Sequence, residues 1–163
     1  MSPRGSLLSV AWIAAGFSVI AAAPVDRKLG AWKLDIAASH LAGPAPGEDL
    51  RTYRRTANGM TRSTHRTTNA DGSVATTIYE ARDDGREYPM HDADGKQTGT
   101  IAFAPHAPGE AQTFVTRRGG KITVRGRTSI SLDGRSKTIA MQAGEDPGNA
   151  REILTIFRRV GDE

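Results

Sequence analysis

The residues of this sequence that could do chemistry are four histidines, a scatter of carboxylates and many arginines. Histidine and carboxylates come closest together at His91, Asp92 and Asp94. A structural zinc site needs four ligands at close spacing, and a calcium loop needs a glycine at its sixth position and a closing glutamate. Neither pattern is complete here, and Asp94-Gly95 is a dipeptide typical of tight turns. The sequence therefore predicts a hairpin turn at this cluster, with no metal and no cofactor.

The sequence also shows no motif for a nucleophilic serine or for a pair of catalytic carboxylates. The chain has no Gly-x-Ser-x-Gly segment of the kind that exposes a nucleophilic serine. The adjacent carboxylates Asp83 and Asp84 fall at another Asp-Gly turn, whereas paired catalytic acids need a desolvated cleft that separates their pKa values. We predict no catalytic residue and favour a protein that is not an enzyme. A small hydrolase or isomerase is the alternative, which a buried titratable group in a cavity would favour.

Arginines concentrate in one region together with a tyrosine and a histidine. The members are Arg51, Tyr53, Arg54, Arg55, Arg62, His65 and Arg66. Guanidinium groups match the geometry of phosphate and carboxylate, so this region could bind an anion or a lipid headgroup. We favour a solvated strand face, on which arginine stems cover apolar surface and the charges protect the sheet.

Regularly spaced turn signals indicate the elements that must position these residues. They are Asn58-Gly59, Asp71-Gly72, Asp84-Gly85, Asp94-Gly95, Pro108-Gly109, Gly119-Gly120, Asp133-Gly134 and Pro147-Gly148. Asn-Gly and Asp-Gly supply the positive φ angles that tight hairpins require. Each interval of roughly 10 to 14 residues fits one strand and one turn.

Between the turns the hydrophobic pattern alternates with period two. In 121–132, alternate apolar residues from Ile122 to Leu132 share one face, and Gly126 in the middle suggests a bend or bulge. No segment after residue 23 sustains a helical stripe. The predicted strands are 30–36, 50–58, 60–68, 73–82, 86–91, 97–103, 111–117, 121–132, 136–142 and 151–159.

Short hairpins between sequential strands give an all-β, antiparallel up-and-down meander. A meander of about eight to ten strands hides its edges best by closing, or nearly closing, into a barrel. An open sandwich or one broad curved sheet is the alternative. Segments 50–58 and 60–68 have polar residues on both faces, so they either line a polar lumen (the interior of the barrel) or form an edge ribbon.

Residues 1–23 differ in kind from the rest of the chain. Arg4 precedes an apolar run from Leu7 to Ala23 that ends in small residues, which is the pattern of a secretory signal peptide. We expect a signal helix that is cleaved after Ala21 or Ala22, and we assign 24–163 to a single periplasmic or secreted domain without a transmembrane segment. An uncleaved anchor is less favoured, because a span needs about 20 apolar residues.

Composition limits the partners of such a domain. The chain has no cysteine, so packing and strand ladders must provide its stability without disulfides. A formal net charge of +4, spread along the chain, favours contact with an anionic envelope surface. It makes no concentrated footprint for nucleic acid, and we expect no nucleic-acid partner.

Gly30-Ala31-Trp32, at the start of the first predicted strand, resembles the Gly-x-Trp signature of the lipocalins. In that family the tryptophan packs over the closed end of the barrel, and an arginine near the last strand lies across the indole. Arg158 and Arg159 occupy that position here, so the resemblance implies a structural clasp formed by Gly30, Trp32, Arg158 and Arg159.

The whole chain after residue 23 resembles a group of small exported bacterial proteins with a lipocalin-like, calycin-type barrel. The motifs that carry this resemblance are Gly30 to Leu34, Gly43 to Pro46, Asp84 to Pro89, Gly119 to Lys121 and Asp133 to Lys137. Together they cover nearly the whole length after residue 23. The resemblance implies a fold and an exported location more than an activity.

We therefore expect an exported binding module that holds a small, mostly apolar molecule in its barrel. The predicted lumen residues are large apolar or aromatic residues on inward faces, namely Tyr53, Tyr79, Phe103, Phe114 and Met141. A barrel of this size can hold one small ligand or be filled by its own side chains. The main alternative is thus an envelope stress or interaction protein with a packed core and a basic surface, and the lumen volume distinguishes the two.

Overall fold

The computed structural model describes residues 26–144 and 152–161, and this part of the chain consists of strands and turns without a helix. The strands are β1 (Gly30–Leu34), β2 (Glu48–Arg55), β3 (Thr61–Thr68), β4 (Val74–Ala81), β5 (Glu87–His91), β6 (Gln97–Phe103), β7 (Gln112–Arg118), β8 (Lys121–Ile130), β9 (Ser136–Ala143) and β10 (Glu152–Gly161). All ten predicted segments are strands. The predicted signal segment 1–23 and the turn at Pro147-Gly148 lie outside the described residues, among which no helix of membrane-spanning length and hydropathy occurs.

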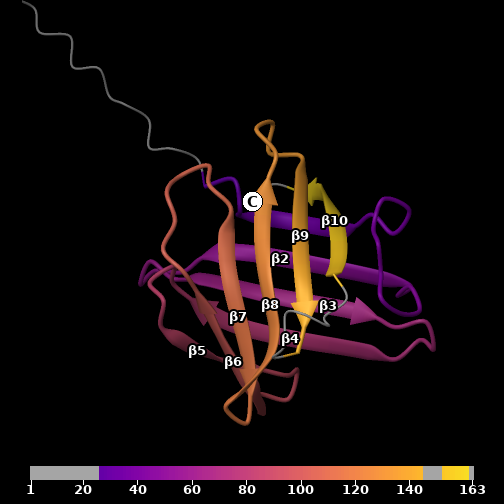
Figure 1. The fold of residues 1–163 in the computed structure, drawn as a ribbon, viewed down its shortest axis with the longest axis horizontal. Coiled ribbons are helices and arrows are strands. Elements are labelled where there is room, and N and C mark those ends of the chain that lie inside the picture. Colours follow the sequence, from indigo (N-terminus) through magenta and orange to yellow (C-terminus); the bar gives the residue numbers. More distant parts are fainter. Residues whose placement is uncertain (1–25, 145–151, 162–163) are drawn as a thin grey trace, which may run out of the picture.

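The ten strands form one closed barrel. Each strand pairs with its neighbours in sequence, and β1 pairs with β10, so that the sheet has no free edge. Strands β2, β3 and β4 run steeply across β7, β8 and β9, which gives a flattened barrel with two crossing walls (Figure 1). The predicted antiparallel meander is confirmed, and it closes with the lipocalin-like form that the Gly-x-Trp motif implied.

Aspartate and glycine shape the hairpins as their sequence signals predicted. At the β4–β5 turn, Asp84 accepts a hydrogen bond of 3.0 Å from the backbone N–H of Arg86, and Gly85 adopts a φ of 78°. The turns at Asp71 and Asp133 repeat the same bond to the backbone two residues later. Side-chain acceptors of this kind fix the turns and thereby the register of the strands.

The structure corrects two details predicted for the segment 121–132. Strand β8 ends at Ile130, and Leu132 is 85% exposed because the next hairpin begins at Ser131. Gly126 lies in regular register with its partners on both sides, so of the bend or bulge expected there the bulge is excluded. A Cβ at Gly126 would lie 2.3 Å from Cζ of Phe114, and the glycine therefore makes room for that ring.

The apolar core divides into two clusters on the inner face of the barrel. One consists of Trp32, Leu34, Tyr53, Ile139 and Phe157. The other consists of Tyr79, Ala81, Ile101 and Phe103, and the ring of Phe114 packs against both. Between these clusters the lumen stays open.

Candidate functional site

The candidate site is the lumen, and strand register decides which side chains meet there. Arg51 on β2 is the partner of Trp32 on β1 and of His65 on β3. Lys137 on β9 is the partner of Phe157 on β10. Paired positions of neighbouring strands point to the same face of a sheet, so these polar residues share the inner face with the buried aromatic rings.

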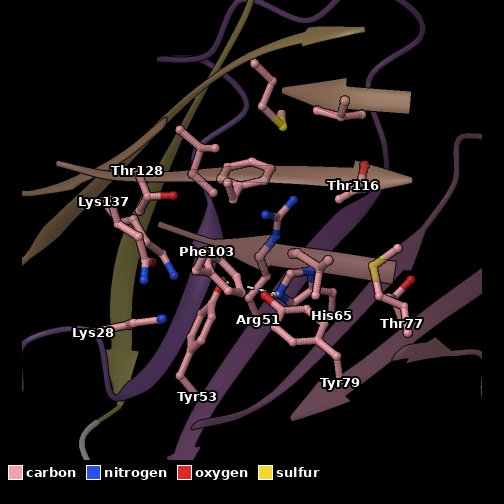
Figure 2. A pocket seen from close by; sticks show the side chains of 17 residues that line it. Lys28, Arg51, Tyr53, His65, Thr77, Tyr79, Phe103, Thr116, Thr128 and Lys137 are labelled. Atoms are coloured by element: carbon pink, nitrogen blue, oxygen red, sulfur yellow. Dashed lines mark hydrogen bonds between the residues drawn. The ribbon is translucent and has the colours of Figure 1, made fainter. Parts of the chain in front are cut away.

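A cavity of about 190 Å³ occupies the lumen (Figure 2). The five residues predicted to line a ligand site all lie on its wall, namely Tyr53, Tyr79, Phe103, Phe114 and Met141. Lys28, Arg51 and Lys137 also line it, and no described Asp or Glu does. The open volume argues against a fully packed core, and its cationic wall departs from the mostly apolar lumen that we expected.

Arg51 is held in the lumen by a buried carboxylate. Its Nε and Nη2 donate to the two carboxylate oxygens of Asp49 at 3.2 and 2.9 Å. The guanidinium also lies 4.4 Å from the ring centroid of Phe157. Such bidentate pairing fixes the arginine and balances its charge, so the solvated face predicted for the arginine-rich region is wrong at this residue.

Arg62 and Arg66 of that region lie on the predicted solvated face. Arg62 faces outward and donates to Glu80 at 2.9 Å, and Arg66 lies 3.9 Å from Glu48. Both side chains are about half exposed. Of the two interpretations left open for strands β2 and β3, the polar lumen is therefore confirmed, with a charged outer face behind it.

Lys28 enters the lumen from the segment that precedes β1. Its Nζ lies 3.6 Å from Oδ1 of Asp83 and 4.7 Å from the ring centroid of Phe103. Burial lowers the pKa of Lys28, and the nearby Asp83 carboxylate opposes this shift. Lys28 and Lys137 reach into the lumen from the same side, with Arg51 and His65 nearer its centre (Figure 2).

Lys137, unlike Arg51 and Lys28, has no carboxylate partner among the described residues. The residue is 1% exposed, and its Nζ has no hydrogen-bond partner among the described groups. The nitrogen lies 3.7 Å from the ring centroid of Tyr53, 4.7 Å from that of Trp32 and 5.7 Å from that of Phe157. Burial lowers the pKa of Lys137 well below its ordinary value, and the charges of Arg51 and Lys28 lower it further.

His65 sits between two tyrosines at the centre of the lumen. The hydroxyls of Tyr53 and Tyr79 lie 3.2 and 3.3 Å from its Nε2. Burial, with the charge of Arg51, lowers the pKa of His65 well below its ordinary value. The imidazole is therefore neutral at physiological pH, and its Nε2 can accept a hydrogen bond from either phenol hydroxyl.

One end of the barrel is closed by the Trp32 clasp. Trp32 is fully buried, and the guanidinium carbon of Arg159 lies 4.4 Å from its ring centroid. Arg159 donates to the backbone carbonyls of Leu29 and Gly134, both at 2.7 Å. Gly30 belongs to the clasp because a Cβ there would lie 2.5 Å from Nη1 of Arg159.

Arg158, the other arginine expected in the clasp, points away from it. Its side chain is exposed and pairs with Asp35 at 3.0 Å. Residues alternate between the two faces of a strand, so Arg159 shares the inner face of β10 with Phe157 while Arg158 takes the outer face.

Of the residues considered for a metal, His91 is the last residue of β5, and Asp92 fixes the turn that follows. Asp92 accepts hydrogen bonds from the backbone N–H groups of Asp94 and Lys96. Within 26–144 and 152–161, no three histidine, aspartate or glutamate side chains are grouped so as to hold a metal ion.

Four ionisable lumen residues are absent from the predicted ligand site, namely Lys28, Arg51, His65 and Lys137, although Arg51 and His65 belong to the region considered for anion binding. A signal for one of them was available, because Lys137 alternates with Ile139 and Met141 on the apolar face of a predicted strand. Lys28 precedes the first strand, and no alternation pattern reaches it.

No family model matches this chain, and no curated protein is similar to it. The fold and the lumen nevertheless define a class of protein: a closed ten-stranded up-and-down barrel with an internal cavity that combines aromatic and cationic walls.

Proposed function

We propose that the protein is a binding module whose lumen encloses a small organic acid. Aromatic side chains surround the apolar body of the ligand, and Lys137 faces its carboxylate. One observation carries the proposal: a buried lysine amine without a hydrogen-bond partner lines a cavity that holds two further cations and no described carboxylate.

The charge balance of the lumen supports an anionic ligand. Arg51 and Lys28 already have the carboxylates of Asp49 and Asp83 behind them. Lys137 has no such counter-charge, although a lysine ammonium carries three donors. A ligand carboxylate supplies both the missing acceptors and the missing charge, which refines the expected apolar ligand to one with an apolar body and an anionic end.

The cavity volume limits the size of that body. Pockets for drug-sized ligands begin at about 300 Å³, and an apolar cavity of about 150 Å³ accommodates benzene. At about 190 Å³, the lumen fits a single ring or a short chain with one carboxylate. The rings of Tyr79, Phe103 and Phe114 form consecutive tilted contacts along one wall, which suits a planar ligand body.

The proposal includes export by the 1–23 segment, since its charged start, apolar run and small-residue end are typical of a signal peptide. Mass spectrometry of the protein from its native host tests this part. We expect a mature N-terminus between Ala21 and Val25. Recovery of intact Met1 in the membrane fraction would show an anchor instead.

Calorimetric titration with benzoate tests the binding proposal, and benzyl alcohol serves as the neutral ligand of similar shape. We expect benzoate to bind more tightly than benzyl alcohol and Lys137→Met to remove most of that preference. Lys33→Met is the matched control, because Lys33 lies on the outer face of β1 and pairs with Glu48. Equal affinity for the two ligands, or a preference that survives in Lys137→Met, would refute the proposal.

His65 favours a second candidate, a proton-transfer enzyme such as an isomerase. A buried, neutral histidine in a cavity is a candidate general base. The test is exchange of the methyl hydrogens of pyruvate in D₂O, followed by NMR. Exchange that is catalysed by the wild type and lost in His65→Gln would support an isomerase, whereas exchange at the buffer rate would leave a binding module.

A further inference from the structure

We infer that Lys137 condenses reversibly with aldehydes and ketones that enter the lumen, forming an imine between its Nζ and the carbonyl carbon. The ligand class thus narrows to carbonyl compounds, above all oxo acids. This inference rests on the proposed lumen-binding function, which supplies the pocket and the recognition of the carboxylate.

The surroundings of Nζ favour the neutral amine. An ammonium in a protein interior needs acceptors for its donors or a carboxylate as counter-charge, and Nζ of Lys137 has neither among the described residues. The three rings around it offer only their π faces. The lowered pKa of Lys137 agrees with this geometry.

A neutral lysine amine is a nucleophile, and its lone pair is the reacting group. Lysines are activated in this way by an apolar pocket or by a neighbouring cation, and Lys137 has both, because Arg51 and Lys28 enter the same lumen. Nζ is buried in this structure. Rotation of the flexible lysine stem must therefore turn the nitrogen from the rings toward the open cavity when a ligand enters.

The reaction is balanced without any co-reactant. The lone pair of Nζ adds to the carbonyl carbon, and one proton passes from nitrogen to the carbonyl oxygen, giving a carbinolamine. The second amine proton leaves with that hydroxyl as water, and the carbon–nitrogen double bond forms. Hydrolysis reverses each step, so the complex releases the unchanged carbonyl compound.

An oxo acid would use the whole lumen at once. Once its carbonyl carbon has bonded to Lys137, that nitrogen no longer serves as the partner of the carboxylate, which would lie near the guanidinium of Arg51 instead. Arg51 binds Asp49 through Nε and Nη2. A guanidinium carries five N–H donors, so Arg51 has further donors for the carboxylate of a ligand.

Reductive trapping tests the inference. Wild-type protein is incubated at neutral pH with benzaldehyde and sodium cyanoborohydride, which reduces an imine to a stable benzylamine. Intact mass and peptide mapping then locate the benzyl group. We expect label on Lys137 at least about tenfold faster than on Lys33, Lys96 or Lys121, because each unit by which a lysine pKa is lowered raises the neutral fraction about tenfold.

Variants and a competitor complete the experiment. Lys137→Met should lose the fast label, whereas Lys33→Met should keep it, and benzoate should slow the labelling of Lys137 alone. Label spread evenly over exposed lysines, or fast label that persists in Lys137→Met, overturns the inference. The wild-type peptide map decides the matter even if a variant fails to fold. Benzoate that binds without any fast labelling by benzaldehyde would leave the proposed function standing and remove the inference alone.

Discussion

Two basic side chains lie against the same indole, and their polar atoms differ in hydrogen bonding. The guanidinium of Arg159 and the amine of Lys137 are 4.4 and 4.7 Å from the ring centroid of Trp32. At the closed end, Arg159 donates to the backbone carbonyls of Leu29 and Gly134. In the lumen, the Nζ of Lys137 donates to no described group.

The contrast distinguishes Arg159, whose hydrogen bonds stabilise the fold, from Lys137, whose nitrogen is available to a ligand. Buried polar groups are almost always hydrogen-bonded, and one that is not costs stability. Where a chain retains such a cost, function is the expected reason. The Arg159 end of the barrel should therefore contribute stability, and the Lys137 site should reduce it.

The largest expected effect is at the indole that the two side chains share. Trp32→Ala should lower the free energy of unfolding by about 3–5 kcal/mol, because it removes a fully buried aromatic ring. Urea unfolding followed by circular dichroism measures this loss. Trp32→Phe, which keeps a ring, should cost less, and a loss below about 1 kcal/mol for the alanine variant would mean that the clasp does not hold the barrel.

Arg159→Met should cost about 1.5–3 kcal/mol, because charge-assisted hydrogen bonds to the carbonyls of Leu29 and Gly134 are lost. Arg158→Met is the matched control at the neighbouring position. It removes an exposed ion pair with Asp35 and should change the stability by less than about 0.5 kcal/mol. The same unfolding measurement compares them, and equal losses would erase the distinction between the two arginines.

Lys137→Met should stabilise the protein by about 1–3 kcal/mol at neutral pH, because an apolar side chain replaces a buried amine without a partner. The gain should shrink as the pH rises. Lys137 titrates near its ordinary value in the unfolded chain and well below it in the folded chain. Between these two values the unfolded state binds more protons, so the wild type gains stability with pH and the methionine variant lacks this gain.

Unfolding curves of both proteins at several alkaline pH values measure the difference. A destabilised Lys137→Met variant would contradict the comparison, since it would show that the contact of Lys137 with the rings holds the core as Arg159 does.

The affinity for benzoate should depend on pH through the same amine. A bound carboxylate favours the ammonium form, whereas Lys137 in the empty lumen has a lowered pKa. Binding should therefore take up a proton, and above the pKa of the empty site the affinity should fall by about tenfold per pH unit, or about 1.4 kcal/mol. Calorimetry in buffers of different ionisation enthalpy counts the protons, and a benzoate affinity that does not change with pH would contradict a neutral Lys137.

The fold could be predicted because its signals are local. Each Asp-Gly or Asn-Gly turn limits a strand, and period-two alternation gives the strands between. The chemical character of the lumen could not be predicted in the same way. Alternation places Lys137 with Ile139, and Arg159 with Phe157, but a charged residue is ordinarily placed in water. Strand register brings Lys137 beside Phe157 and Arg51 beside Trp32. This pairing with buried rings shows that Lys137 and Arg51 lie inside the barrel.

The way the barrel closes has a kinetic consequence. Every seam but one joins strands that are consecutive in the chain, and the exception pairs Ala31 with Gly161. Forming this last seam costs the most loop-closure entropy, so we expect it to form after the hairpins. Arg159→Met should then accelerate unfolding and leave the refolding rate almost unchanged. Stopped-flow measurements of both rates would place the clasp among the last contacts made and the first ones broken.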